Sequence, residues 1–259
     1  MCGRFASPEE KAIARFWHIG RHSNPNPFAR RFNVFPTDTI AFIRRPSNAD
    51  ELELAAGRWG LVPHWWKEAK PPKTSFIARV EEAAGKPMWR DAWSRARCLI
   101  PAEGWYEWQA VERVDPATGE IKRAKQPHFI RRADGALFGF AGLMSYRKDP
   151  KTGEALRSCA IVTTQAAGLL AQIHERAPLV LSESAQNAWL DRRLVHARQV
   201  TELVRSRLPP EAFTHYKVRL LVNDTGLDGP ELIEPLEEEG VPVNAQKLPG
   251  DPRARRGSS

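Results

Sequence analysis

The stretch Arg97-Cys98-Leu99-Ile100-Pro101-Ala102-Glu103-Gly104-Trp105-Tyr106-Glu107-Trp108 decides the fold of this chain. Its first half is a short apolar run, which is typical of a buried strand. Its second half alternates between side chains that point to opposite faces, which is typical of a further strand. The stretch therefore predicts two consecutive strands that pass through the core of a sheet.

Short apolar or alternating runs on both sides of this stretch extend the predicted sheet. Further strands are expected at residues 40–43, 52–54, 58–63, 75–80, 128–130, 137–141, 159–163 and 216–222. Residues 112–126 are polar and contain Asp-Pro and Thr-Gly pairs, so an exposed hairpin loop is expected there. The sheet is thus expected to be built from many short strands.

Helical patterns are scattered between these strands, at residues 8–18, 87–94, 166–174, 184–192 and 196–206. Ser7 is a suitable N-cap for the first helix, and Pro87 suits the first turn of the second. Together the elements predict an α+β fold, a single domain with a curved, barrel-like mixed sheet and several short helices. The domain is expected to span residues 1–236, and the polar, Pro/Gly/Arg-rich tail of residues 237–259 is expected to be disordered.

Composition limits the class of protein. With 259 residues and 42% hydrophobic content, the chain can bury one large core. The sequence contains no apolar run of membrane-spanning length and no signal stretch, so a cytoplasmic protein is expected, associated with the nucleoid when bound to DNA. The three cysteines form no C-x-x-C pair, so we expect neither a disulfide framework, nor a metal site, nor a cofactor.

The charge and the aromatic residues point to an anionic partner. The net charge is +8, which favours nucleic acid, although a solubilising surface with a basic tail remains an alternative. Seven of the nine tryptophans lie between residues 59 and 108, interleaved with Arg and Lys. Aromatic rings beside cations suit unstacked bases and phosphates, although most such rings serve as core anchors.

Cys2 is the strongest candidate for the reactive centre. Removal of Met1 would leave a free amine and a thiol on one residue, and this pair condenses with an aldehyde to a five-membered thiazolidine. Because both groups belong to one residue, the second bond forms intramolecularly and benefits from proximity. The alternative is an ordinary cysteine in a frayed terminus, against which the following Gly3-Arg4-Phe5 argues.

Two further residues are candidates for proton transfer. Glu107 lies between Trp105 and Trp108, where desolvation suits a carboxylate to acid–base chemistry, although a water-facing strand residue is an equal alternative. His174 follows a helix-like stretch and can relay protons near neutral pH, although a lone histidine is more often structural. Nearby Arg176 can hold a phosphate.

Eight blocks of this sequence, in order, resemble the SRAP family (SOS-response-associated peptidase, abasic-site processing proteins). They span about residues 2–236: Met1-Cys2-Gly3-Arg4-Phe5, Arg31-Phe32-Asn33-Val34-Phe35-Pro36-Thr37, Trp59-Gly60-Leu61-Val62-Pro63-His64-Trp65, Ala78-Arg79-Val80-Glu81, Cys98 to Trp108, Ile161-Val162-Thr163-Thr164, His174-Glu175-Arg176-Ala177-Pro178 and Leu232-Ile233-Glu234-Pro235.

The resemblance implies a sensor of abasic sites in single-stranded DNA that acts in the DNA damage (SOS) response. Mature Cys2 would trap the ring-opened aldehyde as a thiazolidine crosslink. By position, Glu107 would assist proton transfer at the amine, and His174 would help to open the sugar ring. The residues matched to the DNA groove or its aromatic rim are Arg4, Asn33, Trp65, Trp66, Arg79, Trp108 and Arg176.

Two positions depart from the family pattern. Ile77 stands where the family motif carries an asparagine that helps to position the crosslink, and losing one such polar contact costs about 1–3 kcal/mol. Ser75, two residues earlier, is expected on the same strand face as a partial substitute. Asp38 replaces a common glutamine and is expected to place a negative charge near the DNA groove.

Alternatives to the sensor stay open at this point. One is an N-terminal-nucleophile thiol peptidase, whose activity is limited in the narrowest case to removing its own Met1. Another is a non-catalytic binder of single-stranded DNA. Strand cleavage by an AP-lyase reaction, reversal of the crosslink and a preference for single-to-double-strand junctions are not decided by the sequence. A monomer is expected.

Overall fold

The structure is a computed structural model that describes residues 2–22, 28–47, 49–68, 72, 74–114, 118–148 and 153–236. Its centre is a closed barrel in which β11, β10, β7, β4 and β5 follow one another, and a parallel pairing of β11 with β5 closes the ring. The predicted α+β fold with a barrel-like mixed sheet is confirmed. The barrel strands are β4 (Thr39–Arg44), β5 (Glu53–Trp59), β7 (Arg97–Ala102), β10 (Phe138–Lys148) and β11 (Ala155–Gln165).

Three short strands add to the barrel: β2 (Arg21–His22) along β5, and β6 (Ile77–Arg79) and β12 (Arg176–Pro178) along β11. A second sheet runs in the order β13-β9-β8-β1-β3. Its strands are β1 (Phe5–Ser7), β3 (Arg31–Val34), β8 (Gly104–Val114), β9 (Ile121–Arg132) and β13 (Phe213–Lys217).

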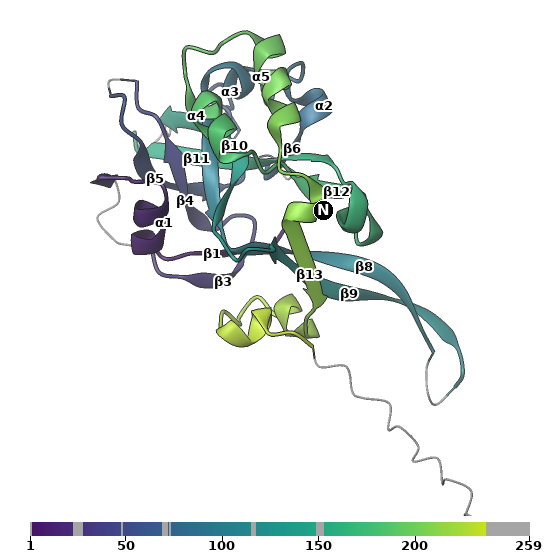
Figure 1. Cartoon of the computed structure of the whole chain (residues 1–259). Helices are drawn as coiled ribbons and strands as arrows, with labels where there is room; N and C mark the ends of the chain where they lie inside the picture. The colour runs from purple at the N-terminus through teal and green to yellow at the C-terminus, as the bar shows by residue number, and fades with distance from the viewer. Residues whose placement is uncertain are drawn as a thin grey trace, which may run out of the picture.

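The stretch from Arg97 to Trp108 links the two sheets, since β7 belongs to the barrel and β8 to the second sheet. Gly104 is the first residue of β8, and a Cβ there would lie 2.6 Å from the carbonyl oxygen of Ile130 in β9, so only glycine fits. Figure 1 shows the β8–β9 hairpin extending away from the body. The predicted loop at residues 112–126 is wrong in extent, because ladder hydrogen bonds continue to the Val114–Ile121 pair.

The α-helices are short: α1 (Glu10–Phe16), α2 (Val80–Ala83), α3 (Arg90–Arg95), α4 (Glu183–Leu190) and α5 (Ala197–Leu203). In Figure 1, α2 to α5 gather at one end of the barrel. Shorter 3-10 turns are η1 (Gly168–Gln172), η2 (Val204–Ser206), η3 (Pro210–Ala212), η4 (Leu220–Asn223) and η5 (Pro230–Ile233).

Several predicted element ends are wrong. Ser7 ends β1 and does not cap α1, whose N-cap is Glu9. The helix predicted from Pro87 begins at Arg90, and the stretch 166–174 forms a 3-10 turn instead of an α-helix. The late strand ends at Lys217, and the chain then turns into η4. Apart from the 3-10 turn, each error lies at an end, where tertiary contacts compete with weak local preferences.

Three buried clusters hold the elements together. One lies between the barrel and the helices and includes Trp93 and Trp189. A second fills the space between the two sheets, around Phe5, Trp59 and Trp105. A third lies between the second sheet and the C-terminal 3-10 turns, around Tyr106 and Val222. The second cluster reaches the N-terminus, because Phe5 packs edge-on against Trp59 and Phe140.

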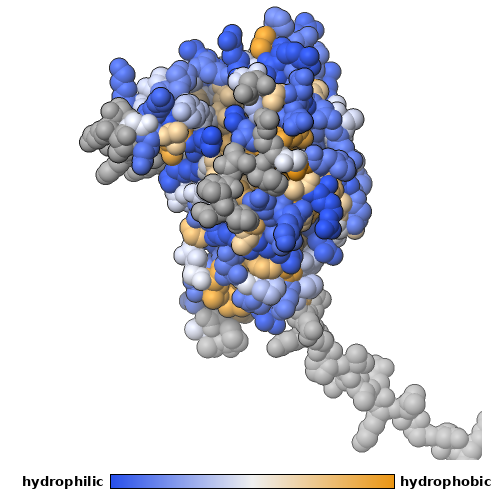
Figure 2. Space-filling view, turned by 90° about the vertical axis from the view of Figure 1, so that its left-hand side faces the viewer, coloured by the Kyte–Doolittle hydropathy of each residue, from blue (hydrophilic) through white to orange (hydrophobic). Residues whose placement is uncertain are grey.

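The surface is largely polar. The face drawn in Figure 2 is mostly hydrophilic, with small hydrophobic patches between the charged residues. Of the helices in the part of the chain that the structure describes, none combines the length and apolar character needed to cross a bilayer. The predicted tail at residues 237–259 lies outside the described residues.

Candidate functional site

Cys2 lies just before β1 and is buried, with 2% of its surface exposed. Its thiol donates a weak hydrogen bond to the carbonyl oxygen of Arg176 in β12, with 3.9 Å between sulfur and oxygen. Phe5, three residues on, is anchored in the core between the sheets. The N-terminal segment is therefore packed and not frayed, which is what a reactive residue at position 2 requires.

Glu107 is the charged neighbour of this thiol. It is 1% exposed on β8, next to β1, because Phe5 pairs with Trp105 across the two strands. Burial raises the pKa of the Cys2 thiol well above its usual value, and the charge and hydrogen bond of Glu107 raise this pKa further. The thiol thus stays protonated at neutral pH and has a buried carboxylate within reach to take its proton.

His174 is fixed through the backbone of Arg176. Its Nδ1 accepts the Arg176 backbone N–H at 3.0 Å, so the neutral ring carries its proton on Nε2. The carbonyl of the same Arg176 accepts the Cys2 thiol. Arg176 of β12 therefore holds both Cys2 and His174. Cys2 and Arg176 are 174 positions apart in the sequence.

Glu107 and His174 line one open pocket of about 460 Å³ with Trp108, Lys125 and Asn223. Lys125 and Asn223 were not predicted from the sequence. Lys125 lies opposite Ala110 on the β8–β9 ladder, and this signal is visible only once the register of the hairpin is known. Asn223 ends η4, and its side-chain oxygen accepts the Trp108 indole N–H at 3.0 Å.

Arg4 and Asn33 are engaged inside the protein. The Arg4 guanidinium donates to the Asn33 side-chain oxygen at 2.8 Å and to the Val222 carbonyl at 2.6 Å. Asn33 is fully buried, and its amide donates to the carbonyls of Asp224 and Leu227. These contacts hold η4, which carries Asn223 into the pocket, and they engage the Asn33 side chain inside the protein.

Arg176 is engaged inside the protein, whereas Arg79 is exposed. The Arg176 guanidinium forms a two-pronged ion pair with Glu81 of α2, at 2.8 and 3.0 Å, and also donates to the Thr163 carbonyl at 2.7 Å. The hydrogen bond from Arg176 lowers the pKa of Glu81, so the pair is ionised at pH 7. Arg79, which pairs with Thr163 on the β6–β11 ladder, is exposed.

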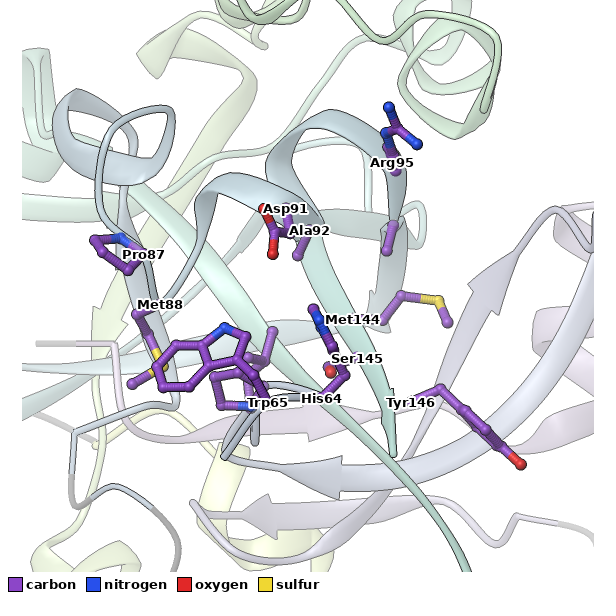
Figure 3. A pocket seen from close by; sticks show the side chains of 13 residues that line it. His64, Trp65, Pro87, Met88, Asp91, Ala92, Arg95, Met144, Ser145 and Tyr146 are labelled. Carbon is purple, nitrogen blue, oxygen red and sulfur yellow. The ribbon is translucent and has the colours of Figure 1, made fainter. Parts of the chain in front are cut away.

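Trp65 and Trp66 lie apart from the pocket of Glu107. Trp65 is 42% exposed and lines a different pocket, of about 240 Å³, between α3 and β10. In Figure 3 its ring lies beside Met88, with Asp91 and Tyr146 on other walls of that pocket. Trp66 is half-buried, and its carbonyl accepts Arg147 Nη1 at 2.8 Å. Of the seven clustered tryptophans, four are buried anchors: Trp59, Trp89, Trp93 and Trp105.

The residues at the two departures have defined contacts. Ser75 lies outside β6, which begins at Ile77, so the expected shared strand is not formed, and the Ser75 hydroxyl donates to the Pro72 carbonyl at 3.0 Å. Ile77 pairs with Ile161 and shares its face. The Asp38 carboxylate accepts Arg31 Nη1 at 2.8 Å, so its negative charge is paired.

The sequence model of the family described as SOS response associated peptidase (SRAP) matches residues 1–225. The chain belongs to the SRAP family. It is 32% identical over 236 residues to the abasic site processing protein YoqW of Bacillus subtilis strain 168, and this alignment covers 90% of this chain and 99% of that protein. It is 33% identical over 243 residues to the abasic site processing protein YedK of Escherichia coli K12, covering 91% and 100%.

Solved structures share the fold of this chain. A protein from Bacteroides thetaiotaomicron has a TM-score of 0.74 at 22% identity and covers 91% of this chain and 100% of its own. A protein from Bordetella bronchiseptica has a TM-score of 0.67 at 26% identity, covering 85% and 100%. Within the described part of this SRAP chain, no group of three or more His, Cys, Asp or Glu residues is placed to hold a metal.

Replacing Glu107 with glutamine is expected to lower the pKa of the Cys2 thiol, because a raising charge is removed while burial stays. The pH dependence of alkylation at Cys2, resolved by mass spectrometry, measures this shift. Glu103→Gln is the matched control, since Glu103 pairs with Arg30 and is not among the groups that shift the pKa of the Cys2 thiol. An unchanged or higher thiol pKa in Glu107→Gln would contradict the assigned contact.

Proposed function

We propose that this protein detects abasic sites in single-stranded DNA and binds them covalently through Cys2 in the DNA damage response. The observation that carries the proposal is the buried Cys2 thiol held by β12 beside Glu107, with His174 fixed by the same β12 residue. The relatives of this chain that are named abasic site processing proteins support it.

The chemistry starts after Met1 is removed. The free amine of Cys2 attacks the aldehyde carbon of the ring-opened sugar and forms an imine, with loss of one water. The thiol sulfur then adds to the imine carbon while its proton passes to the nitrogen, closing the thiazolidine ring. Glu107 relays this proton, and His174, with its proton on Nε2, donates to the sugar oxygen as the ring opens.

The DNA contacts divide into two groups. Arg79 and Lys125 are exposed cations suited to phosphates, and Trp108 beside Asn223 is suited to a base at the pocket rim. Trp65 offers a separate, exposed ring for a neighbouring unstacked base. Arg4, Asn33 and Arg176 support the site by holding η4 and α2 in place.

The decisive experiment compares two single strands that differ in one group. Wild-type protein is incubated with DNA that carries an abasic site, or with a tetrahydrofuran analogue that cannot open to an aldehyde. The expected result is an adduct that survives denaturing electrophoresis with the abasic strand only. Equal adducts with both strands, or none with either, would overturn the proposal. A third arm with a single-to-double-strand junction measures that preference.

A second candidate function is removal of the protein's own Met1. Cys2 is adjacent to the Met1–Cys2 bond, and its thiol contacts the Glu107 carboxylate, which is the pair that a thiol hydrolase needs. Intact mass of wild-type and Glu107→Gln protein, made without a methionine aminopeptidase, tests it. Retention of Met1 in the variant alone would support self-processing, and retention or loss in both proteins would contradict it.

We place the whole activity in residues 1–236 and propose that the protein acts as a monomer in the cytoplasm. A single chain supplies Cys2, Glu107 and His174 to one region, so no second copy is needed to complete the site. AP-lyase cleavage would require loss of the 3′ phosphate after imine formation, and strand scission on the same gels measures it.

Replacing Ile77 with asparagine is expected to speed adduct formation about tenfold, the gain from one added polar contact in the site. Ile77 shares its face with Ile161 and Thr163, next to the guanidinium of Arg176. Initial rates of adduct formation on abasic single strands measure the effect. Ile77→Leu is the control of equal volume without a hydrogen bond, and an equal gain in that variant would contradict the explanation.

A further inference from the structure

Two histidines outside the described pocket, one buried and one half-buried, form a pair. His128 on β9 is 4% exposed, and its Nδ1 lies 3.1 Å from Nδ1 of His215 on β13. Its other ring nitrogen, Nε2, lies 3.1 Å from the side-chain oxygen of Gln109 on β8. No step of the crosslinking chemistry uses these residues, so their arrangement requires its own explanation.

The Gln172 carbonyl sets the direction of this chain of hydrogen bonds. The Gln109 amide donates to that carbonyl at 3.0 Å, and a carbonyl can only accept. The side-chain oxygen of Gln109 must therefore face His128, and His128 must donate to it from Nε2. A neutral His128 then accepts at Nδ1, so His215 donates from its own Nδ1.

The charge state of His128 agrees with this direction. Burial, and after it the neighbouring His215 and Lys217 of β13, together lower the pKa of His128 to about 4. Glu107 is the residue opposite His128 on β8. At pH 7 the His128 ring is neutral, as the series of hydrogen bonds from His215 through His128 and Gln109 to Gln172 requires.

The chain of hydrogen bonds ends two residues before His174. Gln172 is the last residue of η1, and its carbonyl precedes His174 by two positions. The His174 backbone N–H bonds back to Leu170, and its ring is fixed by Arg176 on the other side. Gln109 also lies two residues after Glu107 on one strand, so both side chains point to the same face of β8.

We propose that His128, His215 and Gln109 form a directed hydrogen-bond chain that positions His174 against Glu107 in the pocket. This proposal rests on the proposed function for the role of His174, while the chain itself can be tested without DNA. The three residues are positioning residues, because they act through the Gln172 carbonyl and do not reach the lesion.

The first test is NMR of the imidazole nitrogens in the free protein. We expect His128 to be the neutral Nε2–H form and His215 the Nδ1–H form, and we expect His128→Phe to shift the ring resonances of His174. A His128 ring protonated on Nδ1, or His174 resonances that do not move, would overturn the chain whether or not the protein crosslinks DNA.

The second test is a double-mutant cycle on the rate of adduct formation. His128→Phe keeps the ring without its nitrogens, Gln109→Met keeps the length without the amide, and each is expected to slow the rate about tenfold. The double variant should be no slower than either single one, and His128→Gln, which keeps a donor and an acceptor, should restore most of the rate. Additive losses, or His128→Gln as slow as His128→Phe, would overturn the proposal.

Discussion

Alanine in place of Cys2 is expected to abolish the stable adduct with abasic single-stranded DNA, by at least about 100-fold. The variant keeps its terminal amine and can still form an imine, but imines hydrolyse, and only the thiol can close the ring. Denaturing electrophoresis of protein mixed with labelled abasic DNA measures the loss. Reduction with borohydride should still trap the imine in Cys2→Ala, which separates the loss of the thiol from a loss of DNA binding.

Cys159→Ala is the matched control for this experiment. Cys159 is also a buried thiol, and burial raises its pKa strongly, but it lies in the core between the sheets. It should crosslink like the wild type. Adducts of equal yield from Cys2→Ala and the wild type would remove Cys2 from the mechanism.

Methionine in place of Arg97 is expected to lower the free energy of unfolding by about 3–5 kcal/mol, as for loss of a buried polar network. Arg97 is 5% exposed, and its guanidinium donates to five backbone carbonyls at 2.6–2.9 Å. These carbonyls lie at the end of α3, at the end of α4 and just after α4, where helices leave acceptors without partners. They belong to Trp93, Ser94, Trp189, Asp191 and Leu194.

Urea unfolding monitored by tryptophan fluorescence measures this change. Arg95→Met is the control, because Arg95 is exposed at the end of α3, two residues before Arg97. The loss in Arg97→Lys should fall between those of Arg97→Met and Arg95→Met, since lysine offers three donors and five carbonyls each need a donor. A loss below about 1 kcal/mol in Arg97→Met would show that water satisfies the freed carbonyls.

The sequence determined the elements whose signal is local. Alternating and apolar runs predicted β7, β8 and β11 because a strand buried in a sheet must carry that pattern along its own length. The reactive candidate Cys2 was also found from position alone, since only the residue after Met1 can carry both amine and thiol. The end of β13 was missed because it depends on distant segments: the Lys217 carbonyl accepts the Leu236 N–H, and the Val218 N–H donates to the Pro127 carbonyl.

Only the tertiary structure decided how the site is assembled. Cys2 and Arg176 meet across 174 positions, and Arg176 pairs with Glu81 across 95. Asn33 bonds to the Asp224 carbonyl, and Asp38 pairs with Arg31. Strand register places Lys125 in the pocket, and a 3-10 turn places Asn223 there. No local pattern encodes such contacts, since each depends on the free energy of packing two distant segments together, and that energy exists only once the barrel has closed.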